Sequence, residues 1–134
     1  METFQLNGSY RFIHTPAGVA NISGQLELAS DRSFQGRVRD DIWGLDYSIR
    51  GHLLPQDKVN RLMLIEFSNW AGVGNFVFDL KNSSSSSLGR YKGRWGVIPN
   101  NIHFSSDPEI FNAYLNSFAC WDRTEAEITL SKRK

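Results

Sequence analysis

The segment at residues 89–96, with the sequence GRYKGRWG, alternates strictly between two kinds of residue. Successive side chains on a β-strand point to opposite faces, so Tyr91, Gly93 and Trp95 share one face and the basic residues between them share the other. Several other segments of the chain repeat this period of two. The pattern therefore predicts a protein that is built mainly from short, half-buried strands.

The same alternation places strands along most of the chain. We predict strands at residues 6–13, 19–28, 33–39, 45–53, 61–68, 75–80, 89–96 and 125–131, with a further short strand at 102–104. The low-complexity run at residues 82–87 contains consecutive serines and is expected to form a loop. No alternation of strands with helices is visible, which argues against a parallel α/β sheet.

The pattern changes near residue 106. Ser106 or Asp107 is expected to cap a helix, with Pro108 in its first turn. Apolar residues then recur at helical spacing as far as Trp121. We predict a helix at about residues 107–121 that packs on the sheet. The fifth strand is apolar on both faces, so its outer face is the expected place for this helix.

These elements predict an all-β fold: an antiparallel up-and-down β-barrel of about eight strands with one helix near the C-terminus. Residues 1–134 are expected to form one domain. Four glycines fall in phase on the predicted inward face, where a small barrel can lack room for a side chain beside a large neighbour. They are Gly24, Gly36, Gly51 and Gly93.

The chain resembles the calycins, the barrels that include lipocalins, fatty-acid-binding proteins and avidins. Gly8-Ser9-Tyr10 is similar to the Gly-x-Trp that opens a lipocalin, with tyrosine in place of tryptophan. The Tyr-x-Gly-x-Trp at residues 91–95 resembles strands of small bacterial lipocalin-like and avidin-like barrels, and the helix before a last strand resembles the lipocalin ending. The lipocalin mid-chain Thr-Asp-Tyr is absent. The resemblance implies a lipocalin-like fold and points to no single family.

The inward aromatic residues are the main candidates for a function. Apolar walls with a few placed polar groups suit a small-molecule site, and tyrosine hydroxyls or an indole N–H can supply those groups. We predict that the barrel binds a small hydrophobic or aromatic ligand in its interior, without catalysis. The alternative is that the same side chains fill the interior as core. The predicted ligand-binding residues are Tyr10, Tyr47, Trp70, Tyr91 and Trp95.

A second group of candidates lies on the outward positions. Basic residues there could form a patch for nucleic acid, but they point away from the aromatic residues, and the net charge is only +1. We expect a solvated surface and no nucleic-acid partner. A filled barrel that contacts another protein or a second copy, through these residues or the fifth strand, is an alternative function. The basic residues are Arg37, Arg39, Arg50, Arg90, Lys92 and Arg94.

Catalytic candidates are few. The sequence contains no phosphate-binding loop, no Gly-x-Ser-x-Gly and no pair of histidines at metal-ligand spacing, so no metal or cofactor is predicted. Glu66 is the one acid on an apolar strand face, and burial would raise its pKa. A strand end or a partner arginine is the expected explanation. If the barrel were an isomerase or lyase, Glu66 and His103 would be its acid and base candidates.

The remaining polar residues are expected to be structural. Asp40 and Asp41 are predicted to form a turn, His14 and His52 to lie on the surface, and Cys120 to be a buried, inert thiol on the helix. A single cysteine fits a reducing compartment. No secretory signal or membrane-spanning run is recognisable. We therefore expect a cytoplasmic protein with no membrane span, for which a homo-oligomer is possible.

Overall fold

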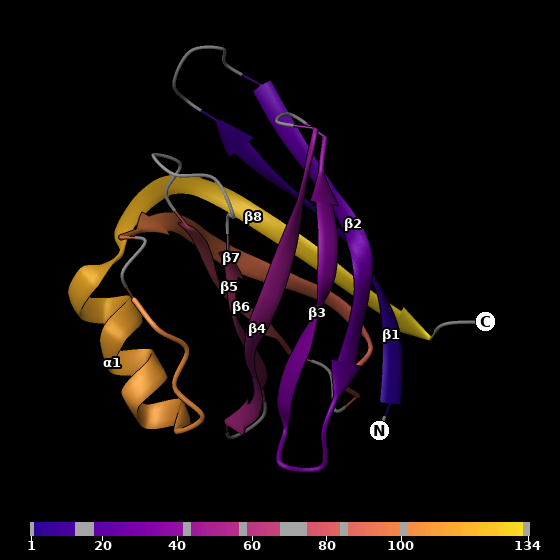
Figure 1. Ribbon diagram of the computed structural model, residues 1–134. Helices are drawn as coiled ribbons and strands as arrows, with labels where there is room; N and C mark the ends of the chain where they lie inside the picture. The colour runs from indigo at the N-terminus through magenta and orange to yellow at the C-terminus, as the bar shows by residue number, and fades with distance from the viewer. Residues whose placement is uncertain are drawn as a thin grey trace.

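The computed structural model describes residues 2–12, 18–41, 44–56, 59–67, 75–83, 86–99 and 102–132. Eight antiparallel strands pair in chain order and close into one barrel, because β1 pairs with both β2 and β8 (Figure 1). The strands are β1 (Glu2–Phe12), β2 (Gly18–Leu28), β3 (Ser33–Asp40), β4 (Leu45–Gln56), β5 (Val59–Phe67), β6 (Asn75–Asn82), β7 (Gly89–Ile98) and β8 (Cys120–Lys132). One helix, α1 (Pro108–Phe118), lies between β7 and β8. The predicted all-β barrel with a helix near the C-terminus is confirmed.

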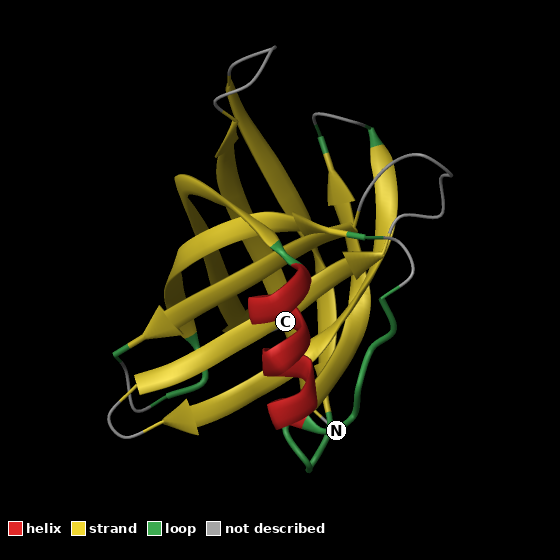
Figure 2. Cartoon of the chain, turned by 90° about the vertical axis from the view of Figure 1, so that its left-hand side faces the viewer, coloured by secondary structure: helices red, strands yellow, loops and turns green. Residues whose placement is uncertain are grey.

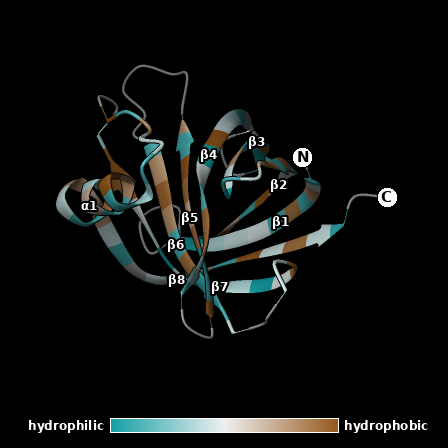
Figure 3. Ribbon diagram, turned by 90° about the horizontal axis from the view of Figure 1, so that it is seen from below, coloured by the Kyte–Doolittle hydropathy of each residue, from teal (hydrophilic) through white to brown (hydrophobic). Residues whose placement is uncertain are grey.

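Much of the sheet buries alternate residues, whereas β5 and β6 also bury residues of their outer faces. In β4, Tyr47, Ile49 and Leu53 are buried, whereas Asp46 and Arg50 are exposed. Figure 3 shows the resulting alternation of apolar and polar residues along the strands. The inward apolar side chains of all eight strands form one core inside the barrel. Their removal from water supplies most of the stability, at about 25 cal/mol per Å² of apolar surface.

The in-phase glycines mark places where neighbouring strands approach closely. A Cβ atom added to Gly93 would lie 2.2 Å from the backbone oxygen of Asp79 on β6. At Gly24, a Cβ atom would lie 1.9 Å from the backbone oxygen of Arg37 on β3. The limiting atoms therefore belong to the backbone of the adjacent strand, and not to a bulky inward side chain as the sequence suggested. These positions let a small barrel bend sharply.

The helix lies on the outside of the barrel (Figure 2) and packs against β5, β6 and β7. Asp107 caps it by accepting a hydrogen bond from the backbone N–H of Glu109 at 2.9 Å. Phe111 and Leu115 are each 1% exposed. They pack with apolar side chains from the outer faces of these strands, among them Met63. The position predicted for the helix, over the outer face of the fifth strand, is confirmed.

The helix is shorter than predicted. It ends at Phe118, and Ala119 is already extended. The residues that follow join β8 instead, where Cys120 pairs with Val97 and Trp121 pairs with Gly96 of β7. Pairing with an existing strand satisfies their backbone groups as well as a helix would. Cys120 is consequently exposed on a strand, so the prediction of a buried thiol on the helix is wrong.

The predicted short strand at residues 102–104 is also absent, since this segment is irregular. It packs beside α1 instead, where Phe104 stacks on the ring of His52 with centroids 5.1 Å apart. His52 Nε2 lies 2.9 Å from the backbone oxygen of Ser105. His52 points out of the barrel but is only 2% exposed. The prediction of a surface histidine is wrong because this segment covers it. His14 lies outside the described residues.

The loop predicted at residues 82–87 starts one residue later, because Asn82 ends β6. Ser86 accepts a hydrogen bond at its backbone oxygen from Asn60 Nδ2 at 2.9 Å. Ser87 accepts one from the hydroxyl of Tyr91 at 2.7 Å. These bonds tie the described end of the loop to the barrel. No helix in the described part of the chain is long and apolar enough to cross a membrane.

Candidate functional site

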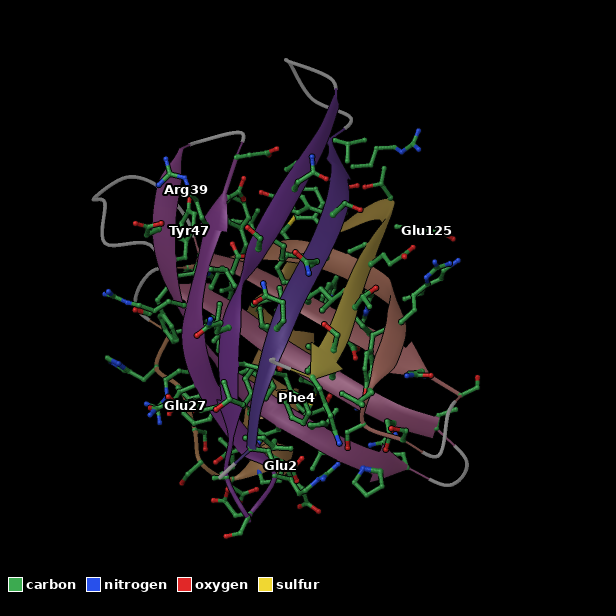
Figure 4. All side chains as sticks on the ribbon, turned by 90° about the vertical axis from the view of Figure 1, so that its right-hand side faces the viewer. Glu2, Phe4, Glu27, Arg39, Tyr47 and Glu125 are labelled. Carbon is green, nitrogen blue, oxygen red and sulfur yellow. The ribbon has the colours of Figure 1, made fainter. Side chains whose placement is uncertain are left out.

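Four polar side chains gather inside one end of the barrel. We call this the upper end: β1 finishes there at Phe12, β3 at Asp40 and β5 at Phe67, toward the top of Figure 1. Figure 4 shows Tyr47 near this end and Phe4 near the opposite one. The four residues, called the polar cluster below, are each at most 1% exposed. They are Tyr10 of β1, Asp40 of β3, Tyr47 of β4 and Glu66 of β5.

The strand period places both acids inside. Asp40 follows the inward Val38 by two residues, and Glu66 follows the inward Leu64 by two residues. Each therefore continues an apolar face of its strand to the upper end of the barrel. The two strands bring the acids to the same end because β3 and β5 both run toward it.

The turn predicted at Asp40 and Asp41 is right for only one of the two residues. Asp41 lies in the turn, where its carboxylate accepts hydrogen bonds from the backbone and side-chain nitrogens of Asn21. Asp40 is the last residue of β3 and is fully buried. Asp40 was not among the predicted site residues, although the period of two from Phe34 onward would have placed it on the inward face.

The hydrogen bonds of the cluster are incomplete within the described residues. Tyr10 donates its hydroxyl hydrogen to Oδ2 of Asp40. The hydroxyl of Tyr47 and both carboxyl oxygens of Glu66 have no hydrogen-bond partner there. A buried polar group without a partner costs about 1–3 kcal/mol, so native proteins keep few of them. The arginine partner considered for Glu66 is absent from the part of the barrel that the structure describes.

The cluster is electrostatically coupled. Burial raises the pKa of Glu66 well above its usual 4.5, and the nearby Asp40 carboxyl raises it further. Burial likewise raises the pKa of Tyr47 to about 12, with added contributions from both acids. Burial and the hydrogen bond to Asp40 raise the pKa of Tyr10. Glu66 therefore keeps its proton at a pH where a solvated glutamate would be ionised.

Aromatic rings surround these polar groups. The ring of Tyr10 lies 4.8 Å from Trp95 and 6.0 Å from Phe76, between centroids. Tyr47 meets the same Phe76 edge-on at 6.2 Å. The indole N–H of Trp95 already donates to Oγ1 of Thr124 at 2.9 Å. The indole is thus anchored, and the rings form an apolar wall beside the free hydroxyl and the free carboxyl.

Three of the four predicted ligand-binding residues that the structure describes share this place. Tyr10, Tyr47 and Trp95 are buried at the upper end and are linked through Phe76. Tyr91 is buried too, but its hydroxyl is bonded to the 86–88 segment at the other end. Trp70 lies outside the described residues. Phe76 was not among the predicted residues, although its phase with Phe78 and Leu80 would have placed it inside.

The catalytic candidates are not brought together. His103 is exposed outside the barrel, whereas Glu66 is fully buried within it. No group of three or more His, Cys, Asp or Glu side chains in the described chain is arranged to hold a metal ion.

The outward basic residues are exposed but fall into two groups. Arg37, Arg39 and Arg50 lie on β3 and β4, and the others lie on β7, across the closed barrel from β3. Arg90 pairs with Glu127 at 2.8 Å, and Arg94 lies over the ring of Trp121 at 3.9 Å. They therefore form no single positive stripe.

Comparison with known proteins supports the fold. No protein-family model and no curated protein matches the sequence. Among solved structures, EF1p2_mFAP2b bound to DFHBI is similar to this chain, with a TM-score of 0.56. The match covers 98% of this chain and 92% of that one, at 11% sequence identity. Identity this low shows a shared barrel fold, and carries no residue-level correspondence.

Proposed function

We propose that this barrel binds a small aromatic molecule in its interior at the upper end. The single observation that carries the proposal is a pair of buried polar groups that have no hydrogen-bond partner among the described residues, the Tyr47 hydroxyl and the Glu66 carboxyl. They lie beside the ring wall of Tyr10, Phe76 and Trp95. Small-molecule sites combine apolar walls with a few placed polar groups in this way.

The solved barrel EF1p2_mFAP2b, with DFHBI bound, lends the proposal a parallel at the level of fold. Tyr47 and Glu66 offer a ligand two hydrogen bonds that are otherwise unmade. A ligand that made these bonds would remove the cost of burying the two groups without a partner. Tyr10, Tyr47 and Trp95 are the predicted residues retained in this site.

The alternative of a surface interaction module has less support. The outer face of β5, one of its two proposed surfaces, is covered by α1 through Phe111 and Leu115. The other surface, the outward basic residues, is divided between two sides of the barrel. Acid–base catalysis by Glu66 and His103 is not supported either, since one is inside the barrel and the other outside.

The test is to titrate the protein with each member of a panel of planar aromatic molecules that differ in charge. Isothermal titration calorimetry measures the binding. We expect at least one member to bind with a Kd below about 1 mM. Tyr47→Phe should weaken that binding by roughly 2- to 13-fold, the value of one net hydrogen bond of about 0.5–1.5 kcal/mol. It should leave the fold intact, because the hydroxyl it removes has no described partner.

Tyr114→Phe is the matched control, because it removes the same atom from a tyrosine on α1, outside the barrel. It should leave the affinity unchanged. The proposal fails if no panel member binds. It also fails if the Tyr47→Phe variant binds every ligand as tightly as the wild type and the Tyr114→Phe control do.

A further inference from the structure

Both oxygens of the Glu66 carboxyl lie inside the barrel without a partner. The side chain is fully buried on β5, and neither oxygen has a hydrogen-bond partner among the described residues. Leu62 and Leu64 of the same strand belong to the inner core, so the period of two directs Glu66 inward as well. A ligand that reaches this side chain therefore meets two adjacent oxygen atoms that are free to bond.

An aromatic ring lies on the strand next to this carboxyl. Glu66 pairs directly with Phe76 of β6 in the sheet, and both side chains point inward. Three further rings pack against Phe76 at centroid distances of 6.0–6.2 Å, those of Tyr10, Tyr47 and Trp95. The carboxyl thus adjoins the ring wall, and one flat molecule can contact both.

The Glu66 carboxyl keeps its proton above the usual pKa of glutamate. Burial raises its pKa well above 4.5, and the Asp40 carboxyl of β3 raises it further. The other ionisable groups that face it are the hydroxyls of Tyr10 on β1 and Tyr47 on β4, whose own pKa values are raised. The described inward residues of β2, β6 and β7 at this end carry no ionisable group. A protonated carboxyl offers one O–H donor beside one carbonyl acceptor.

We propose that the ligand is a neutral cyclic amide, a planar aromatic ring system in which an N–H stands beside a carbonyl oxygen. The carbonyl accepts a hydrogen bond from the O–H of Glu66, and the N–H donates to the other oxygen of Glu66. The ring packs on the wall around Phe76. This inference rests on the proposed function, because it names the chemical class of the molecule bound at that site. One edge of the ligand then satisfies both carboxyl oxygens.

Other chemical groups satisfy this carboxyl less completely. A ketone, an ether or an anion supplies acceptors alone and leaves one oxygen of Glu66 without a donor. An ammonium group supplies donors alone, so it pairs with the ionised carboxylate, which is the form that burial disfavours. The side-by-side donor and acceptor of a cyclic amide match the protonated form.

Ionisation of Glu66 removes the hydrogen atom that it donates. The pair of hydrogen bonds therefore holds only while the carboxyl keeps its proton. The affinity for a cyclic amide should be constant, or fall, as the pH rises from about 5 to about 9. A ligand that needed the ionised carboxylate would show the opposite dependence.

The experiment compares two neutral probes of the same shape, quinolin-2(1H)-one and coumarin, by isothermal titration calorimetry. Coumarin has a ring oxygen where the quinolinone has its N–H, so it keeps the acceptor and lacks the donor. We expect the quinolinone to bind about 5- to 160-fold more tightly, because coumarin leaves one buried oxygen of Glu66 without a partner. The titration of the quinolinone is repeated at about pH 5 and about pH 9 to measure the dependence on pH.

Substitutions at Glu66 separate the hydrogen bonds from the ionisation. Glu66→Gln keeps a donor beside an acceptor in its amide, so it should retain the preference for the quinolinone and bind it no more weakly at high pH. Glu66→Leu has neither group and should lose the preference. Urea unfolding of each variant shows whether it is folded. Glu125→Leu is the matched control, since Glu125 is exposed on β8, outside the barrel, and it should behave as the wild type does.

Several results would overturn the inference while the proposed function stands. They are equal binding of the two probes by the wild type, tighter binding of the quinolinone as the pH rises, loss of the preference in a folded Glu66→Gln variant, and its retention in a folded Glu66→Leu variant. The same holds if neither probe binds but another member of the aromatic panel does. If no member of that panel binds either, the proposed function fails as well.

Discussion

At the scale of single residues, the burial of Glu66 makes the stability of the barrel depend on pH. This side chain is fully buried, and neither of its oxygens has a partner in the described structure. Its pKa is higher in the folded protein than in the unfolded chain. Below the usual pKa of about 4.5, both the folded and the unfolded state hold the proton, so the ionisation of Glu66 costs the folded protein no stability. Above it, only the folded state holds the proton, so stability falls as the pH rises toward the folded pKa.

Glu66→Gln should remove this dependence on pH. The amide is of nearly the same size as the carboxyl and does not titrate. The free energy of unfolding of the variant should therefore rise relative to that of the wild type as the pH rises. The gain can reach about 1.4 kcal/mol per pH unit between 4.5 and the raised pKa of the folded protein. Urea unfolding of both proteins at about pH 5 and about pH 8 measures it. If the difference in the free energy of unfolding between the variant and the wild type is the same at both pH values, the pKa of Glu66 is not raised.

Glu125, which is exposed on β8, serves as the control in this experiment. Glu125→Gln removes a carboxyl from the outer face of β8 and should change the free energy of unfolding by no more than about 0.5 kcal/mol at either pH.

At the scale of elements, close strand pairing depends on glycine. The backbone oxygen of Asp79 on β6 occupies the place where a side chain of Gly93 on β7 would begin, at 2.2 Å. Gly93→Ala should therefore push the two strands apart and lower the free energy of unfolding by about 1–3 kcal/mol, the usual cost of overpacking. Chemical denaturation measures the loss.

Gly18→Ala provides the comparison for that substitution. Gly18 also lies on a strand, at the start of β2, and a Cβ atom there would meet nothing within 4 Å. This variant should be neutral or slightly stabilised, by up to about 1 kcal/mol, because alanine restricts the unfolded chain. Equal effects at the two positions would mean that strand contact is not the reason for glycine in β7.

The helix shows how one element depends on another. Asp107 and Pro108 mark its start in the sequence, and the start is where they predict it. The end was predicted three residues too late because Trp121 continues the helical spacing of apolar residues. In the folded chain the same residue pairs with Gly96 of β7 and belongs to β8. Pairing between distant segments outweighed the local pattern there.

At the scale of the whole molecule, closure of the barrel decides where surface charges go. The outward basic residues of β3 and β4 are separated from those of β7 by half the circuit of strands. Several are also paired, as Arg39 is with Asp46 at 3.4 Å. The net charge of the chain is +1. Among the described residues, these basic side chains therefore form no concentrated positive patch of the kind that nucleic-acid binding requires.

We expect a fluorescent single-stranded DNA of about 20 nucleotides to bind with a Kd no tighter than about 100 μM near physiological salt, the weak end of non-specific binding. Fluorescence anisotropy measures it. A Kd in the low micromolar range that rises steeply with salt would contradict the prediction and favour an interaction surface on the outside of the barrel.

Much of this fold could be predicted from local patterns. The period of two identified all eight strands and the inward position of Tyr10, Tyr47 and Trp95, because the pleat of a strand determines which face a side chain takes. The apolar residues on both faces of β5 also predicted that a helix would cover it. Glu66 was recognised as unusual on the same grounds.

The site itself depended on contacts between distant strands. Closure of the barrel brings Tyr10, Asp40 and Glu66 to one end, from strands that are far apart in the chain. Packing of α1 and the segment before it buries His52, and pairing with β7 draws Cys120 into β8. A local pattern specifies the direction of a side chain, but not which distant side chains it meets.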